Sequence, residues 1–317
     1  MKQQQDYSNI ICKNLLTTKG RAGLTRSVHP VIFTFIMNEE QVNIPFENFA
    51  QYYDQFMLRL VNYPAWVDYI VKIFNEYNLF PKTILDLACG TGIPSLLLAK
   101  QGYRVIGVDN SLPMLEIFKD KVQKTNYNIH PAPFVRLNGN DTRNDRSISS
   151  HLVKKDGVQI IHSDIRNFSV PEKVDAAVSF YDSINYLLTE DHLKHCFSCV
   201  AESLKPNGIF TFDMNTIYCL ESFWDNRETP RRINDIYTIW RNTFDHEQGI
   251  STLKLIVYTD DGRVFEETHK ERAYSENDLQ HILHSVGFTD VRFYAHLTLL
   301  PPNDTTLRIM VVARNRR

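Results

Sequence analysis

Thr83-Ile84-Leu85-Asp86-Leu87-Ala88-Cys89-Gly90-Thr91-Gly92 is the stretch of this chain that decides its fold. The apolar run predicts a buried strand over 83–89, and the Gly-x-Gly turn leads into a predicted helix over 93–101. Glycine suits such a turn because it allows a sharp change of direction and a close approach of a ligand to the backbone. The next predicted strand, 104–109, ends in Asp109, a carboxylate suited to accept both hydroxyls of a ribose.

Strands and helices continue to alternate along the chain. Apolar residues at steps of three and four predict helices over 115–122 and 193–204. With the two strands above, the apolar runs at 158–163, 174–180, 209–214, 290–296 and 307–313 complete a set of seven. This pattern predicts an α/β fold: a Rossmann-like, seven-stranded, mostly parallel sheet with helices on both faces.

Two segments interrupt the alternation. Residues 126–155 are rich in Asn, Asp, Ser, Arg and Pro, and we expect an exposed insertion there. Residues 235–244, 249–258 and 263–272 alternate polar and apolar side chains, which predicts a three-stranded antiparallel meander inserted after the fifth strand. The expected organisation is a main domain of 41–215 and 275–317, with 216–274 as an inserted lid over a substrate.

The N-terminal part divides into a tail and a helical region. Residues 1–40 are polar and lack a period, so we expect a mobile tail, and we take Met37 as a candidate for the biological start. Residues 45–79 are rich in aromatic side chains and predict helices.

The composition gives no support to several classes of partner. The 317 residues carry a net charge of −2, which gives no electrostatic case for binding nucleic acid or an anionic membrane. No run of 18 apolar residues is present, so no membrane span is expected. Only Cys196 and Cys199 form a close pair among the five cysteines. We therefore expect free thiols, no metal site and a cytoplasmic location.

Two kinds of adenosine-containing cofactor are compatible with the glycine loop. Enzymes that bind dinucleotides use G-x-G-x-x-G to seat a pyrophosphate, but Ser95 stands where the third glycine would fall. Asp86 also precedes the glycines, and a carboxylate there disfavours a pyrophosphate and suits a cationic ligand. S-adenosylmethionine (SAM) carries a sulfonium and an ammonium and no phosphate, so the residues favour SAM.

The chain resembles the class I SAM-dependent methyltransferases. Residues 86–92 are similar to the first motif of that family, 107–111 with Met114 to the second, and Ser163-Asp164-Ile165 to the end of its third strand. The resemblance implies SAM as cofactor and a set of residues that bind it: Tyr53, Trp66, Asp86, Ala88, Cys89, Gly90, Gly92, Asp109, Asn110, Met114, Asp164, Ile165 and Phe180.

Roles follow from the resemblance for several of these residues. Gly90 and Gly92 would border the methionine part, Asp109 would take the ribose, and Asp164 would meet the adenine amine. Cys89 would pack the loop and would not act as a nucleophile. The aromatic residues of the N-terminal helices would close over the cofactor, where their faces suit a sulfonium, or would pack the core.

The acceptor side is expected after the fourth and fifth strands, at 180–186 and 213–215. The first of these stretches resembles a bacterial subgroup with a β-meander after strand five, which includes amino-sugar N-methyltransferases. The resemblance implies methyl transfer to nitrogen or oxygen of a small molecule. Asp182, Tyr186 and His269 are the catalytic candidates, and Tyr274 is a further one.

Other functions stay open at this point. A SAM-binding module without catalysis would keep the same cofactor motifs. A nucleic-acid or protein methyltransferase is a further alternative, although the Asn/Asp-Pro-Pro-Tyr/Phe signature of amino-methylating nucleic-acid enzymes is missing after the fourth strand. The inserted sheet is also where contact with a second copy would be expected.

Overall fold

The computed structural model describes residues 45–124, 129–131, 153–155 and 157–316. The expected N-terminal tail, the candidate start at Met37 and most of the expected insertion at 126–155 therefore lie outside the described residues. Within the described part of the chain, no helix is long and apolar enough to cross a membrane.

The central sheet has the strand order β12-β13-β7-β6-β1-β2-β5-β4-β3. Its parallel strands are β1 (Thr83–Leu87), β2 (Arg104–Asp109), β5 (Val158–His162), β6 (Val174–Ser179) and β7 (Leu204–Asn215). Two antiparallel strands, β12 (Phe288–Ala295) and β13 (Arg308–Asn315), complete the predicted set of seven and confirm the Rossmann-like fold. Two short strands from the inserted segment, β3 (Ile129–Pro131) and β4 (Val153–Lys155), add an edge beside β5 that the sequence analysis did not predict.

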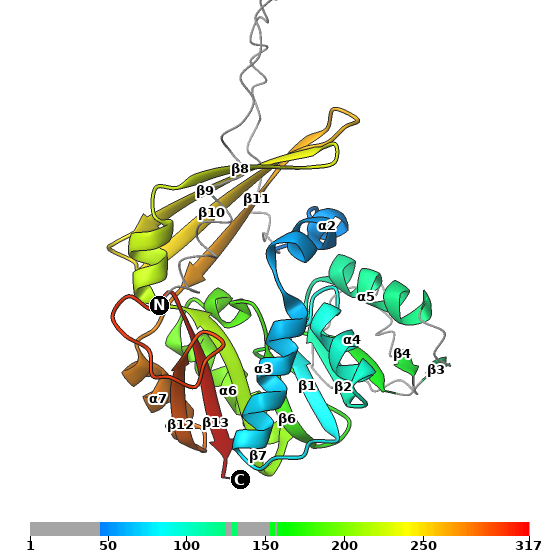
Figure 1. The fold of residues 1–317 in the computed structure, drawn as a ribbon, viewed down its shortest axis with the longest axis vertical. Coiled ribbons are helices and arrows are strands. Elements are labelled where there is room, and N and C mark those ends of the chain that lie inside the picture. Colours follow the sequence, from blue (N-terminus) through cyan, green and yellow to red (C-terminus); the bar gives the residue numbers. More distant parts are fainter. Residues whose placement is uncertain (1–44, 125–128, 132–152, 156, 317) are drawn as a thin grey trace, which may run out of the picture. The chain divides into compact units, whose positions relative to one another are not determined.

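Helices cover both faces of this sheet (Figure 1). On one face lie α3 (Tyr63–Glu76), α4 (Ile93–Lys100) and α5 (Leu112–Lys124), and on the other α6 (Glu190–Ser203) and α7 (Glu276–Ser285). Successive side chains of a strand point to opposite faces. Ile84 therefore joins the cluster with α3, whereas Leu85 joins the cluster with α6 and α7. Burial on both faces explains why β1 reads as a continuous apolar run.

A separate antiparallel sheet is inserted between β7 and α7, after a π-helical segment, η2 (Cys219–Trp224). It has the order β11-β10-β9-β8, with β8 (Glu228–Ile233), β9 (Ile236–Asp245), β10 (Ile250–Tyr258) and β11 (Val264–Arg272). The predicted three-stranded meander corresponds to β9–β11, and the predicted strand number was wrong because β8 was missed. Pro230 lies in β8 and weakens the strand pattern, and it is tolerated there because β8 is an edge strand.

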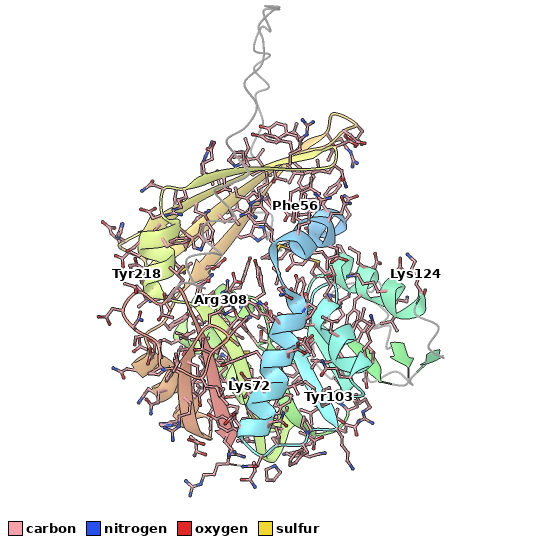
Figure 2. The ribbon with its side chains drawn as sticks, viewed as in Figure 1. Phe56, Lys72, Tyr103, Lys124, Tyr218 and Arg308 are labelled. Carbon is pink, nitrogen blue, oxygen red and sulfur yellow. The ribbon has the colours of Figure 1, made fainter. Side chains whose placement is uncertain are left out.

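Helix α2 (Ala50–Leu60) joins the inserted sheet to the main domain. Phe56 lies on this helix (Figure 2). Phe56 and Phe49, which comes just before the helix, are fully buried and pack with Leu255 and Val257 of β10. The loops that follow β1, β2, β6 and β7 all leave the carboxyl edge of the parallel sheet, which is where open α/β sheets place their ligands.

Candidate active site

The loop after β1 has a backbone that glycine makes possible. Gly90 and Gly92 have φ angles of +52° and +75°. A Cβ atom on Gly92 would lie 2.1 Å from the ring of Phe118, so no larger residue fits there. A Cβ on Gly90 would meet no protein atom within 4 Å, so this glycine faces open space. The loop is therefore packed on one side and open on the other, as a cradle for a ligand requires.

Asp109 at the end of β2 is the acid of this cradle. Its carboxylate accepts a 2.8 Å hydrogen bond from the backbone N–H of Gly90 and another of 2.8 Å from that of Ser111. Burial raises the pKa of Asp109, although these backbone hydrogen bonds oppose the change. Each oxygen keeps a further lone pair, so the carboxylate fits the two hydroxyls of a ribose.

Cys89 packs the loop against the sheet. Its Sγ would lie 2.8 Å from a Cβ on Gly107, and its side chain joins the cluster that contains Phe118. Burial raises the pKa of the Cys89 thiol well above its ordinary value, with Asp109 and Asp86 adding to the effect. The geometry therefore agrees with a packing role and leaves no thiolate for a nucleophile.

Asp164 follows β5 and is already paired within its own loop. The Arg166 guanidinium donates to both of its oxygens at 2.5–3.1 Å. Burial alone would raise the pKa of Asp164, but the hydrogen bonds from Arg166 outweigh it and hold the pKa below its ordinary value. The predicted contact of Asp164 with an adenine amine would share this carboxylate with Arg166. Ile165 beside it is partly buried against the core.

Helix α2 is tied directly to the glycine loop. Asp54 accepts a 2.6 Å hydrogen bond from the Thr91 hydroxyl and forms an ion pair with Lys121 of α5. Lys121 in turn donates to the Thr91 carbonyl at 2.9 Å. These contacts hold α2 against the glycine loop. Tyr53, one of the predicted cofactor residues, lies on this helix. The Tyr53 ring lies 5.3 Å from that of Phe46.

The remaining predicted cofactor residues occupy different positions. Met114 on α5 is buried beside the loop, while Asn110 is exposed and its carbonyl interacts with His162. Trp66 lies at the other end of the site, with its ring 5.7 Å from Tyr181 and 4.6 Å from His296. Phe180 is buried in the same cluster as Trp66. The structure thus places Trp66 and Phe180 near Tyr181, in the segment predicted for the acceptor, and their predicted contact with the cofactor stays a prediction.

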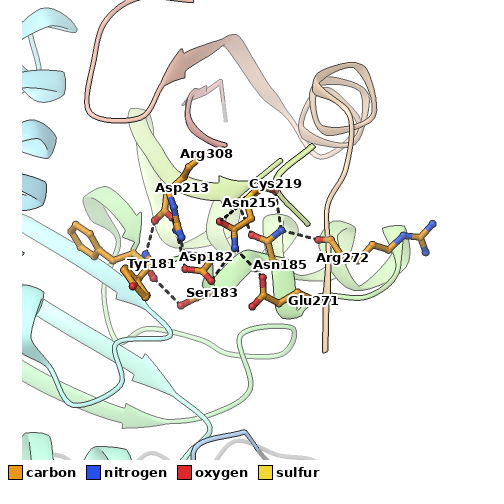
Figure 3. Close-up of polar contacts among 11 residues, drawn as sticks. Tyr181, Asp182, Ser183, Asn185, Asp213, Asn215, Cys219, Glu271, Arg272 and Arg308 are labelled. Carbon is orange, nitrogen blue, oxygen red and sulfur yellow. Dashed lines mark hydrogen bonds and ion pairs between the residues drawn. The ribbon is translucent and has the colours of Figure 1, made fainter. Parts of the chain in front are cut away.

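That side contains a cluster of buried charges, shown in Figure 3. Arg308 of β13 forms ion pairs with Asp182, at 2.8 Å, and with Asp213. Asn215 donates to Asp182 at 3.1 Å and to Glu271 of β11 at 3.0 Å. Two carboxylates therefore pair with the Arg308 guanidinium, and a third carboxyl group, that of Glu271, is connected to Asp182 through Asn215.

The turn that carries Asp182 is held in a strained backbone conformation. Tyr181 and Asp182 have φ angles of +60° and +55°. Their backbone N–H groups donate to the two oxygens of Asp213, at 2.5 and 2.8 Å. Such left-handed residues persist where surrounding contacts fix them, and they occur often at functional sites. Asp213 has no exposed side-chain surface and serves as the anchor, whereas Asp182 keeps 13% of its side chain accessible.

Burial raises the pKa of Glu271 to about 8, and the nearby charge of Asp182 adds to this effect. Part of the Glu271 surface is accessible. The sequence analysis included Asp213 in the acceptor segment 213–215 and Glu271 in the predicted strand 263–272, but it singled out neither residue and gave Arg308 no role. A carboxylate at the carboxyl end of the fifth strand was the signal for Asp213, whereas nothing in the sequence pattern marks Arg308 as its partner.

The other catalytic candidates lie beside this cluster. The Tyr186 hydroxyl lies 3.2 Å from Nδ1 of His269, and His269 is 1% exposed. Tyr274 donates a 2.5 Å hydrogen bond to the Leu187 carbonyl and is buried. The structure therefore brings Asp182, Tyr186 and His269 together and gives Tyr274 a structural contact.

The strand order, the glycine cradle and the acid at the end of β2 together define a class I methyltransferase that uses SAM. Residues 85–212 match the family model described as "Methyltransferase domain". The chain is 28% identical over 279 residues to a "Putative methyltransferase" of Geobacillus sp. (strain WCH70), covering 85% of this chain and 99% of that protein. This chain is therefore a SAM-dependent methyltransferase, EC 2.1.1.-.

Two further proteins are similar over most of their length. A SAM-dependent methyltransferase of Clostridium acetobutylicum has a crystal structure that superposes with a TM-score of 0.69, at 25% identity, over 86% of this chain and 99% of that one. A glycine/sarcosine N-methyltransferase of Aphanothece halophytica is 22% identical, over 78% of this chain and 81% of that protein.

Proposed function

We propose that this enzyme transfers the methyl group of SAM to the nitrogen of a small, cationic amine. The observation that carries the proposal is the excess of carboxyl groups on the predicted acceptor side, where Asp182 and Asp213 pair with Arg308 and Glu271 is connected to Asp182 through Asn215. A buried excess of like charge is costly unless a partner of opposite charge completes it. An ammonium group supplies that charge.

Asp182 and Glu271 are the carboxylates available to such a partner. Asp213 has both oxygens engaged by the Tyr181–Asp182 turn and Arg308, whereas the other two keep accessible surface. Because the pKa of Glu271 is raised to about 8, this group is largely protonated at neutral pH in the absence of a cation. An ammonium beside it would favour its ionised form and would be bound by it.

The surrounding aromatic side chains suit the same ligand. The Arg308 guanidinium lies over the rings of Trp66 and Tyr181, at 5.5 and 5.1 Å from their centroids. Aromatic faces attract cations and exclude water, and methyl transfer needs a dry, aligned approach of nucleophile and methyl group. SAM supplies the methyl group, while these side chains orient the acceptor and keep water away.

Each domain has a part in this proposal. The cradle at Gly90 and Asp109 would hold the cofactor, and the inserted sheet of β8–β11 would cover the acceptor. The N-methyltransferase name of the Aphanothece halophytica relative supports nitrogen as the acceptor atom. A phosphate-rich acceptor such as nucleic acid is disfavoured, because the cluster would repel it.

A panel of small primary and secondary amines, each matched with the corresponding hydroxyl compound, tests the proposal. With ¹³C-methyl SAM, NMR of the products distinguishes N-methyl from O-methyl groups. We expect amines to be methylated much more efficiently than their hydroxyl partners. Methylation of hydroxyl compounds alone would contradict the proposal, and SAM binding without turnover of any compound would favour a non-catalytic module.

A further inference from the structure

We infer that Glu267, His269 and Tyr186 form a proton relay, in which Tyr186 receives the proton that leaves the acceptor and Glu267 fixes the tautomer of His269. The relay rests on the proposed function in one respect: methyl transfer must release a proton from the acceptor. It serves nitrogen and oxygen acceptors equally, so its test is separate from that of the amine.

The three side chains form a chain of two contacts, and Tyr186 at its end lies near Asp182 and Glu271. Nε2 of His269 lies 3.5 Å from Oε2 of Glu267, and Nδ1 of His269 lies 3.2 Å from the Tyr186 hydroxyl. Glu267 and His269 are two residues apart on β11 and so point to the same face of the inserted sheet. Both are almost fully buried, at 3% and 1% exposure, while Tyr186 on η1 (Ser183–Tyr186) keeps accessible surface.

The two oxygens of Glu267 have different partners. Oε1 accepts hydrogen bonds from the backbone N–H groups of Asn48, at 2.5 Å, and Phe49, at 2.9 Å, where α2 begins. Among the described residues, the buried Oε2 has no hydrogen bond, and its contact with Nε2 of His269 is 3.5 Å long. A helix N-terminus leaves such N–H groups without intrahelical partners. One carboxylate therefore caps α2 and faces the histidine at the same time.

This arrangement decides which nitrogen of His269 carries the proton. Burial would raise the pKa of Glu267, but its contact with His269 and the two backbone hydrogen bonds hold the pKa below its ordinary value, so Glu267 is ionised. A buried carboxylate oxygen needs a donor. Nε2 is therefore protonated, and Nδ1 is left to accept the hydrogen of the Tyr186 hydroxyl.

In the relay, Tyr186 gains one proton and loses one. The acceptor gives its proton to the phenolic oxygen of Tyr186, as the Tyr186 hydroxyl proton passes to Nδ1 of His269. The resulting imidazolium lies beside the Glu267 carboxylate, which stabilises its charge. Burial raises the pKa of Tyr186 well above its ordinary value, with Glu271 and Asp182 adding to the effect, so the phenol stays neutral before and after the transfer.

The Glu267→Gln variant of the full chain separates the relay from the helix cap. The amide oxygen of glutamine would keep the bonds from Asn48 and Phe49, which turns its NH₂ group toward His269. An NH₂ donor requires Nε2 to be unprotonated, so the ring proton moves to Nδ1. Long-range ¹H–¹⁵N NMR of the imidazoles reports this tautomer without any acceptor, and a His269→Asn spectrum identifies the signal.

In the wild type we expect an Nε2-protonated ring, and in Glu267→Gln an Nδ1-protonated ring with an unchanged circular dichroism spectrum. With whichever compound the panel shows to be methylated, Glu267→Gln and Tyr186→Phe should each lower kcat about 100-fold, and the double variant should lower it no further. An Nδ1-protonated ring in the wild type overturns the relay. Unchanged kcat in both single variants overturns it as well and leaves Glu267 a helix cap only.

Discussion

The hydroxyl of Ser95 donates a 2.5 Å hydrogen bond to the carboxylate of Asp86, which closes the glycine loop with a side-chain contact. Ser95 is fully buried and Asp86 is 1% exposed. The position where a dinucleotide enzyme has its third glycine is thus filled by a side chain that the loop uses. Burial raises the pKa of Asp86 to about 7, although the Ser95 hydrogen bond opposes the change.

This raised pKa predicts a pH-dependent stability. The ordinary pKa of the Asp86 carboxyl is 3.8, so folding disfavours its ionised form, and the free energy of unfolding should fall as the pH rises from about 4 to about 7. Asp86→Asn keeps an acceptor for the Ser95 hydroxyl and cannot ionise. Its free energy of unfolding should therefore exceed that of the wild type by up to ~4 kcal/mol at pH 8. Thermal unfolding of both proteins between pH 4 and pH 8 checks this. Parallel stability profiles would contradict it.

Replacement of Asp109 should weaken SAM binding. Asp109→Ala removes the acceptor predicted for the ribose hydroxyls, and a hydrogen bond to a charged group contributes ~1.5–3 kcal/mol. Calorimetry should therefore show an affinity at least about tenfold lower. The circular dichroism spectrum should be unchanged. An unaltered SAM affinity in this variant would show that Asp109 does not bind the cofactor.

The two loop glycines should respond differently to substitution. Gly90→Val directs a side chain into open space, so the protein should fold and lose SAM binding, although the positive φ adds some strain. Gly92→Ala brings a methyl group against Phe118, so its melting temperature should fall instead. If Gly90→Val binds SAM as the wild type does, the open side of the loop is not the cofactor site.

The sequence was sufficient for the central sheet because β1 is buried throughout and its apolar run leads directly into Gly90-Thr91-Gly92. The glycine loop and Asp109 lie close together in the sequence, so their proximity in the fold was predictable. The acceptor cluster was not, because Asp182, Glu271 and Arg308 come from three distant segments that only the fold brings together. Strand β8 was not predicted either, because Pro230 interrupts the residue pattern by which strands are recognised.

The inserted sheet was expected to act as a lid over a substrate, and the contacts of α2 also connect it to the glycine loop. Glu267 of β11 caps α2, and Asp54 of α2 holds Thr91. Asp54→Ala removes the acceptor of the Thr91 hydrogen bond and the partner of Lys121. The partly buried ion pair between Asp54 and Lys121 contributes ~1 kcal/mol. SAM should then dissociate about fivefold faster in stopped-flow measurements. Lys72→Ala on the neighbouring helix is the control and should leave the rate unchanged.

The central claim, that the acidic cluster selects a cationic amine, is tested most directly by the ratio of kcat/KM for an amine to that for its matched hydroxyl compound. Glu271→Gln is nearly isosteric and keeps an oxygen for the Asn215 hydrogen bond. Loss of one member of a buried charge pair costs ~2–5 kcal/mol, so this ratio should fall by about 30-fold or more, with SAM affinity unchanged. The same ratio in the wild type and in Glu271→Gln would contradict the account.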